Sequence, residues 1–177
     1  MKYLIMCEGP NELEVIKILL RHGCLKFTED DLLGLIPYHA RQIKSSGIVQ
    51  TALNIYPGEV TILRIGDKLN EQLKIPREYQ QKIKSVEKYC TKPELEMLLI
   101  ISEGLTKEFE KIKSKERAKF FAKKHIKCGR RPYKNDTSFY TEYYDNNPEL
   151  LVQSIKEYSH IKGSHGKDEH YLAELLK

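Results

Sequence analysis

The chain has 177 residues, which suits one domain and is short for two of ordinary size. Hydrophobic residues make up 40%, charged residues 31%, the net charge is +5 and the mean hydropathy is −0.54, values typical of a globular protein with a charged surface. No apolar run approaches the roughly 20 residues of a membrane helix, and no secretory signal is recognisable, so we expect a cytoplasmic protein without membrane contact.

The first elements in chain order predict the opening of an α/β unit. Residues 3–7 form a continuous apolar run, typical of a central strand covered on both faces. The segment 8–12 breaks the run, and Pro10 suits the first turn of a helix. Apolar residues at helical spacing then predict a helix to about His22 that stops at Gly23.

The following segment predicts further strands. Residues 32–36 favour a second strand, and 40–54 favour a polar helix. The β-branched run at 60–65 is the clearest strand pattern in the sequence, and 86–90 predicts another short strand.

The rest of the chain predicts helices. Thr91 and Glu94 have capping-box spacing ahead of an apolar helix at 95–101, which ends at Gly104. No strand pattern follows. The three further helices that we expect are at about 107–127, 148–160 and 167–176.

These elements predict an α/β fold with a mostly parallel sheet flanked by helices, followed by a helical C-terminal part. We expect residues 1–104 to form the α/β core and residues 105–177 to form a helical, partly basic extension that packs on that core within one compact domain.

Two pairs of carboxylates follow predicted strands at matching spacing. Glu8 follows the first strand and Glu12 lies four residues later, while Asp67 follows the strand at 60–65 and Glu71 lies four residues after it, in an expected helical turn. Parallel strands deliver such residues to one edge of a sheet, where ligands bind. We therefore expect these four acids to hold Mg²⁺ or Mn²⁺. The alternatives are that Glu12 is an ordinary glutamate in the first turn of a helix, that Glu8 is an exposed loop residue, and that Asp67 belongs to an ordinary turn after Gly66.

Residues 3–12 resemble the first motif of TOPRIM domains, in the form of an apolar strand, Glu-Gly-x-x-Glu and a helix that occurs in OLD-like nucleases. Residues 92–99 resemble a Pro-acidic-apolar-Glu segment of small TOPRIM-like proteins in phage-defence systems. The resemblance covers roughly residues 1–104. It implies that Glu8 and the acids after a later strand bind metal for phosphodiester chemistry. The second motif differs, because Asp67 is a single aspartate where Asp-x-Asp is expected.

The resemblance also implies a lysine that faces the scissile phosphate. Lys167 has the matching place in chain order, with Lys162 as the second choice, and a fixed ammonium there neutralises charge in the transition state. The alternative is a glycine-rich linker with exposed lysines.

The segment 107–134 is strongly basic. It holds twelve lysines and arginines against three glutamates, so that it carries +9. Such a segment suits a polyanion partner, whereas for the charge run taken alone a solvated helical face is the more ordinary interpretation. Two interpretations are open for the aromatic residues at 139–144: they stack on the bases of a nucleic acid, or they pack the helical part against the sheet. The residues that we expect to contact nucleic acid are Lys123, Lys124, Lys127, Arg130 and Arg131.

Together these features predict a Mg²⁺- or Mn²⁺-dependent nuclease, with Glu8, Asp67 and Lys167 as catalytic residues and DNA or RNA as substrate. The resemblance implies a setting in defence against phage or mobile DNA, with a partner ATPase or self-association. One alternative is a TOPRIM-like binding or sensor subunit without catalysis, which the incomplete Asp-x-Asp motif favours. A basic adaptor for a protein partner is the other.

Overall fold

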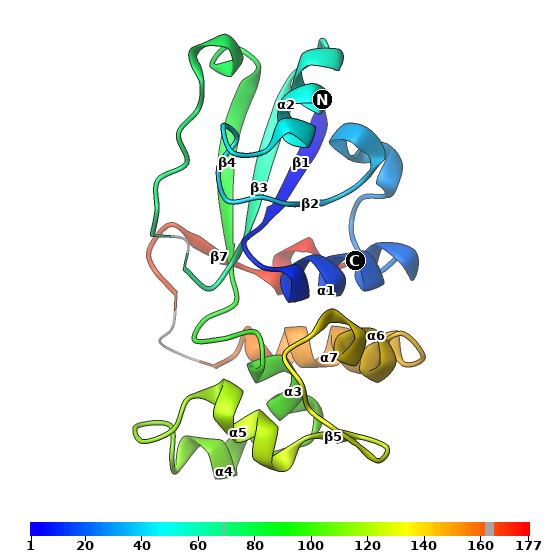
Figure 1. Ribbon diagram of the computed structural model, residues 1–177, viewed down its shortest axis with the longest axis vertical. Helices are drawn as coiled ribbons and strands as arrows, with labels where there is room; N and C mark the ends of the chain where they lie inside the picture. Colours follow the sequence, from blue (N-terminus) through cyan, green and yellow to red (C-terminus); the bar gives the residue numbers. More distant parts are fainter. Residues whose placement is uncertain (69, 162–164) are drawn as a thin grey trace.

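The fold is built on one parallel sheet. The computed structural model describes residues 1–68, 70–161 and 165–177. Five strands lie in the order β2-β1-β3-β4-β7, and every neighbouring pair is parallel (Figure 1). In chain order they are β1 (Lys2–Cys7), β2 (Tyr38–His39), β3 (Val60–Gly66), β4 (Ile83–Cys90) and β7 (Glu169–Tyr171). The predicted α/β fold with a parallel sheet is confirmed.

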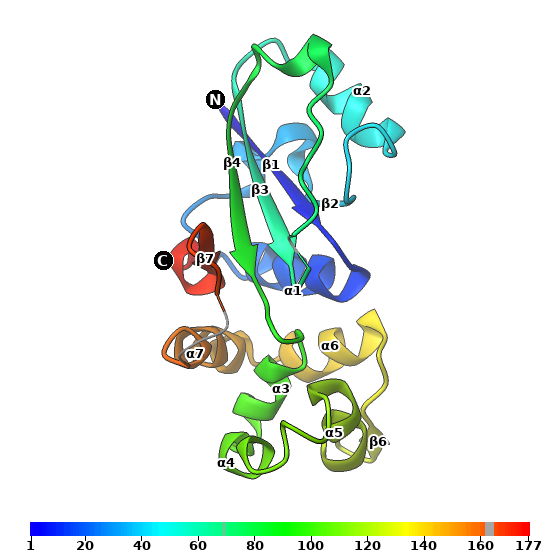
Figure 2. The same cartoon turned by 90° about the vertical axis from the view of Figure 1, so that its left-hand side faces the viewer.

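Most of the helices lie beyond the carboxyl ends of the strands. Figures 1 and 2 both show the sheet at one end of the molecule and α3 to α7 gathered at the other, with α1 between them. The helices are α1 (Pro10–Arg21), α2 (Gly47–Ile55), α3 (Met97–Ser102), α4 (Thr106–Glu110), α5 (Ala118–His125), α6 (Thr137–Tyr144) and α7 (Pro148–Tyr158). A two-stranded antiparallel hairpin of β5 (Lys127–Cys128) and β6 (Arg131–Pro132) follows α5. None of the helices in the described ranges is long and apolar enough to span a membrane.

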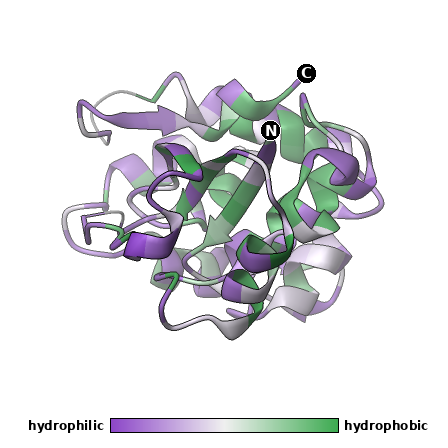
Figure 3. Cartoon of the chain, turned by 90° about the horizontal axis from the view of Figure 1, so that it is seen from above, coloured by the Kyte–Doolittle hydropathy of each residue, from purple (hydrophilic) through white to green (hydrophobic). Residues whose placement is uncertain are grey.

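Alternate residues of the central strands enter two separate cores. Ile5 and Leu63 pack with α1 and the helical part, whereas Leu4 and Ile62 pack with α2 on the other face. Seen from above, the strand at the centre is largely apolar, whereas the loops at the periphery are mostly polar (Figure 3). Burial on both faces explains why residues 3–7 are apolar without alternation.

The segment between β1 and β3 differs from the prediction. The expected strand at 32–36 is wrong, because this segment forms 3-10 turns at Glu29–Asp31 and Leu33–Leu35. Gly34 has a φ of +70° there, which turns the chain out of an extended path. The strand β2 forms after Pro37 instead, and the expected helix at 40–54 begins only at Gly47, where the Ser46 side chain caps it by accepting from the Val49 N–H.

The C-terminal part also departs from the prediction. The expected helix at 107–127 is two helices, α4 and α5, and the expected helix at 167–176 is wrong. Residues 169–171 pair with β4 as an edge strand, and a 3-10 turn at Leu172–Leu175 follows. Pairing with a neighbouring strand overrides the weak helical pattern of this short segment. The part after residue 104 is therefore mostly helical, but it also completes the sheet.

Candidate functional site

The acidic loops after β1 and β3 meet at the carboxyl edge of the sheet. Cys7 pairs with Ile65 in parallel register, so both strands end at the same level. After β1 the chain enters α1 within three residues, because Gly9 is the N-cap and Pro10 opens the first turn. The first turn of α1, which carries Glu12, thus lies next to the loop after β3, which carries Asp67.

A pocket of about 470 Å³ lies at this edge, between the two loops and the N-terminal part of α5. It brings opposite charges together in one cavity. The carboxylates that line it are Glu12, Asp67, Glu94 and Glu96. The basic side chains that line it are Arg41, Arg117, Lys119 and Lys123. A surface of this kind suits a phosphate group together with a cation that bridges it to the acids.

Glu12 is largely buried and has other carboxylates nearby. Burial raises its pKa from the ordinary 4.5 to about 7, and the negative charges of Asp67, Glu96 and Glu8 add to the effect. Neither Glu12 nor Asp67 forms a salt bridge within the described part of the chain. These two carboxylates, predicted from sequence spacing, are therefore brought into one pocket.

Glu8 lies differently from its predicted place. Its side chain is buried, its Oε2 accepts from the Lys68 N–H at 2.9 Å, and its Oε1 lies 3.7 Å from Nη2 of the buried Arg64. It is not among the described residues that line the pocket. The pairing with Arg64 weighs against a metal-ligand role and makes Glu8 an anchor for the loop after β3.

Glu71 does not extend the acid cluster. The residues after Asp67 form no helix before the 3-10 turn at Arg77–Tyr79, so the expected helical turn at Glu71 is wrong. The Glu71 side chain is exposed, and its backbone carbonyl accepts from Arg64 Nη1 at 2.7 Å. Glu71 therefore contributes its backbone carbonyl, which holds the Arg64 guanidinium in place, and not its carboxylate.

The close approach of Gly66 to Glu8 gives a testable prediction. A Cβ at position 66 would lie 2.2 Å from Oε2 and 2.6 Å from Cδ of Glu8. We expect Gly66→Ala to displace Glu8 and to lower the free energy of unfolding by about 1–3 kcal/mol, measured by urea denaturation. Gly47→Ala, where a Cβ meets nothing within 4 Å, is the matched control. Equal stability of Gly66→Ala and the native chain would contradict the tight packing of Glu8.

Two further carboxylates of the pocket already have partners. Glu94 accepts from the Arg117 guanidinium and, at 2.9 Å, from the Lys119 N–H. Glu96 accepts from the Tyr133 hydroxyl at 2.7 Å. The expected capping box of Thr91 and Glu94 is wrong. The Glu94 carboxylate accepts from the Lys119 N–H at the start of α5, and the N-cap of α3 is Glu96. In the sequence, the acidic motif at 92–99 and the capping-box spacing of Thr91 and Glu94 both drew attention to this segment, but neither predicted that Glu94 and Glu96 line the pocket.

Asn11 presents an unpartnered oxygen in the pocket. The residue is 8% exposed, and its Nδ2 donates to Asn135 Oδ1 at 2.7 Å. That bond leaves Asn11 Oδ1 buried with no hydrogen-bond partner among the described residues. A buried acceptor in this state is costly unless a donor or cation reaches it.

The basic residues expected to contact nucleic acid divide into two groups. Lys123 lines the pocket, and Lys127 and Arg130 are exposed on the β5–β6 hairpin. Lys124 pairs with Glu116, and Arg131 pairs with Asp136 and Glu142. The other basic side chains that line the pocket are Arg41, Arg117 and Lys119. Counting charges along the sequence could not show which of the many basic residues would reach the pocket.

The aromatics at 139–144 mostly pack the helical part. Phe139, Tyr140 and Tyr144 are fully buried, and the half-buried Tyr143 donates to Glu103. The packing alternative is therefore the correct one for these residues. The exposed aromatic of the site is Phe120 on α5, which sequence reasoning missed because it adjoins the buried Phe121.

Lys167 lies away from the pocket. It is exposed in the turn before β7, and the pocket-lining residues that the structure describes do not include it. Lys162, the second choice for the same role, falls outside the described residues. The cations at the pocket come from α5 and its N-terminus instead.

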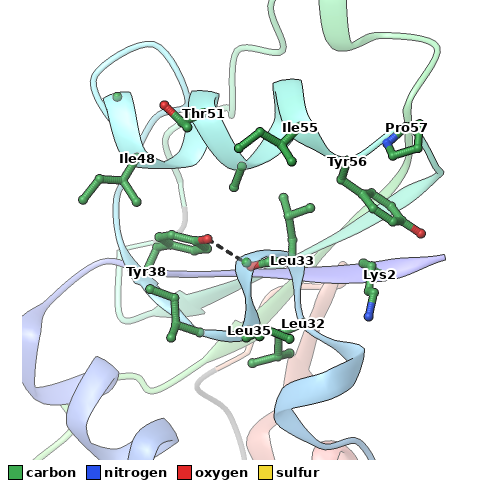
Figure 4. Close-up of a pocket in the computed structure, with 14 residues that line it drawn as sticks. Lys2, Leu32, Leu33, Leu35, Tyr38, Ile48, Thr51, Ile55, Tyr56 and Pro57 are labelled. Atoms are coloured by element: carbon green, nitrogen blue, oxygen red, sulfur yellow. Dashed lines mark hydrogen bonds between the residues drawn. The ribbon is translucent and has the colours of Figure 1, made fainter.

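A larger, apolar pocket of about 800 Å³ lies near the amino end of β1. Figure 4 shows Ile48, Ile55 and Leu35 around it, with the Tyr38 hydroxyl donating to the Leu33 carbonyl at 3.0 Å. Lys2 is the single charged residue among its lining side chains in the described chain. This pocket lacks the charges that phosphate chemistry needs.

The pocket carboxylates can be compared with the ligands that a divalent metal ion needs. Across residues 1–68, 70–161 and 165–177, no three His, Cys, Asp or Glu side chains are placed to hold one ion together. Mg²⁺ often uses only one or two carboxylates and keeps several waters, and the side chains of Glu12, Asp67 and Asn11, which line the same pocket, carry the oxygen donors that it prefers. No protein-family model, curated protein or solved structure matches the chain.

Proposed function

We propose that the chain is a metal-dependent nucleic-acid phosphodiesterase of TOPRIM type, working in the cytoplasm in defence against phage or mobile DNA. The observation that carries the proposal is the shared pocket, which Glu12 from the first turn of α1 and Asp67 from the loop after β3 line together with Arg117, Lys119 and Lys123. The resemblance of residues 3–12 to the first TOPRIM motif supports it, as does the parallel sheet that brings β1 and β3 to one edge.

Glu12 and Asp67 would hold Mg²⁺ or Mn²⁺, with Asn11 Oδ1 as a third oxygen. Burial is the main reason that the pKa of Glu12 is raised, and the nearby carboxylates of Asp67, Glu96 and Glu8 add to it; a divalent cation would stabilise the charged form of Glu12. The buried Asn11 Oδ1, which has no hydrogen-bond partner among the described residues, would gain a positive neighbour. When bound, the ion activates water and stabilises the leaving oxygen.

The basic side chains of the pocket bind and orient the phosphodiester. Arg117 is held by Glu94 while its side chain stays 66% exposed, so the guanidinium is positioned and still accessible. Lys119 and Lys123 follow on the same helix, and Arg41 adds a cation from the loop after β2. This set takes over the electrostatic role expected of Lys167.

The decisive test is cleavage by two pocket variants. We expect Glu12→Gln and Asp67→Asn each to lower the rate of Mn²⁺-dependent cleavage of labelled DNA and RNA by about 100-fold or more, because each removes a charged ligand. The readout is product formation on denaturing gels. The exposed residues Glu78 and Asp168 supply the matched controls Glu78→Gln and Asp168→Asn, which should cleave at the native rate. Native activity in both pocket variants would refute the proposal.

A second candidate function is nucleic-acid binding without hydrolysis, as a subunit of a larger assembly with an ATPase or another copy of the chain. The pairing of Glu8 with Arg64 and with the Lys68 N–H favours it, because the first-motif glutamate is then occupied. Titration calorimetry with Mn²⁺ separates the two functions. Mn²⁺ uptake that Asp67→Asn abolishes supports hydrolysis, whereas nucleic-acid binding without such uptake supports the binding subunit.

A further inference from the structure

Phe120 is an exposed aromatic in charged surroundings. Its side chain is 49% exposed on α5, whereas its neighbours Phe121 and Ala122 are buried in the core. Large exposed hydrophobic residues otherwise lie mainly at the apolar pocket of Figure 4, where Leu35, Ile36, Ile48 and Ile55 cluster; Met1, at the N-terminus, is the remaining one in the described chain. Phe120 is thus separate from the apolar surface and belongs to the acidic and basic pocket.

Cations flank the Phe120 ring on its own helix. The Lys123 ammonium lies 5.9 Å from the ring centroid, and Lys119 and Arg117 line the same pocket. An aromatic face at the mouth of a basic groove is the combination by which proteins hold unpaired nucleotides, with the phosphates on the cations and a base on the ring. Bases inside a duplex are already stacked on their neighbours and do not offer a free face.

We propose that the site takes single-stranded nucleic acid and that Phe120 stacks on a base next to the phosphate bound in the pocket. The inference rests on the proposed function, since it assumes that the pocket binds a phosphodiester, and it adds the strandedness of the substrate. Phe120 lines the same pocket as Glu12 and Asp67, so a base stacked on its ring would belong to a strand whose phosphate enters the proposed metal site.

The test is equilibrium binding measured by fluorescence anisotropy, with EDTA present to prevent cleavage. The probes are labelled dT12, rU12, a DNA hairpin of matched phosphate number and an abasic 12-mer with the same phosphates and no bases. We expect Phe120→Ala to weaken binding of dT12 or rU12 by about 10-fold, with little change for the hairpin and the abasic strand. The dT12 and rU12 arms distinguish DNA from RNA.

Matched variants separate stacking from general apolar contact. Phe120→Tyr should keep native affinity, whereas Phe120→Leu should weaken binding nearly as much as Phe120→Ala, because leucine offers no π face. Ile55→Ala, at a residue that is 77% exposed on the apolar pocket, should bind as the native chain does. Lys123→Ala should reduce the salt dependence of binding, which Phe120→Ala leaves unchanged.

The outcomes distinguish this inference from the proposed function. If the native chain binds none of the probes in EDTA, the stacking inference fails, and the Mn²⁺-dependent cleavage assay with Glu12→Gln and Asp67→Asn decides the proposed function separately. If it binds dT12 and the hairpin equally, or if Phe120→Leu and Phe120→Ala bind single strands as well as the native chain, the stacking inference fails while the proposed function stands.

Discussion

Replacing Arg64 by methionine is expected to lower the free energy of unfolding by about 3–5 kcal/mol. Arg64 is 2% exposed in β3, its Nη1 donates to the Glu71 carbonyl at 2.7 Å, and its Nη2 lies 3.7 Å from Glu8 Oε1. Removal of the guanidinium leaves the buried Glu8 carboxylate without a countercharge and the Glu71 carbonyl without its donor. Urea denaturation at pH 7 measures the loss.

The double variant Glu8→Gln/Arg64→Met identifies the cause. Once both charges are gone, no buried ion lacks a partner, so the double variant should recover a substantial part of the stability that Arg64→Met loses. The same urea midpoints provide the comparison. A double variant that is as unstable as Arg64→Met, or less stable, would mean that Arg64 acts through packing alone and that its ion pair with Glu8 contributes nothing.

The pH dependence of stability is expected to depend on Glu12. Its pKa is about 7 in the folded chain against an ordinary 4.5, so between these values the folded state keeps a proton that the unfolded state has lost. The stability from this group is fully present below pH 4.5 and is lost as the pH rises through about 7. The native chain should therefore lose up to about 3 kcal/mol between pH 4 and pH 8 relative to Glu12→Gln.

Unfolding midpoints in urea, measured in EDTA across this pH range, check the prediction. Glu78→Gln, at an exposed position, is the control and should follow the native curve. Addition of Mn²⁺ at pH 8 should stabilise the native chain more than Glu12→Gln, because a ligand that binds only the folded state raises its stability. Parallel pH curves for the native chain and Glu12→Gln would contradict the largely buried environment of Glu12 near other carboxylates.

Much of the sheet was predictable because β1 and β3 have strong local signals. Residues 3–7 and 60–65 are apolar on both faces, and a parallel pair of that kind brings its carboxyl ends together whatever follows. The placement of Glu12 and Asp67 at one edge follows from that rule. The strand β7 was not predictable, because three residues on the edge of a sheet carry no periodicity of their own.

The roles of the individual acids depended on contacts between distant segments. Glu8 and Asp67 are equivalent in sequence, since each follows a buried strand, but within the described part of the chain the buried Arg64 forms an ion pair with Glu8 and not with Asp67. Glu94 accepts a hydrogen bond from Arg117, which lies 23 residues later in the chain. Counting charges in the sequence cannot identify such a pair.

The amino-acid sequence by itself determined the parallel sheet, the acidic edge and the basic character of the later segment, because strand burial and charge are local properties of the chain. Only the tertiary structure decided which acids remain unpaired, which of the many cations reach them, and that Phe120 rather than the tyrosine-rich segment is exposed beside them. Those outcomes depend on how the helical part packs beyond the strand ends, which is set by contacts between residues far apart in the sequence.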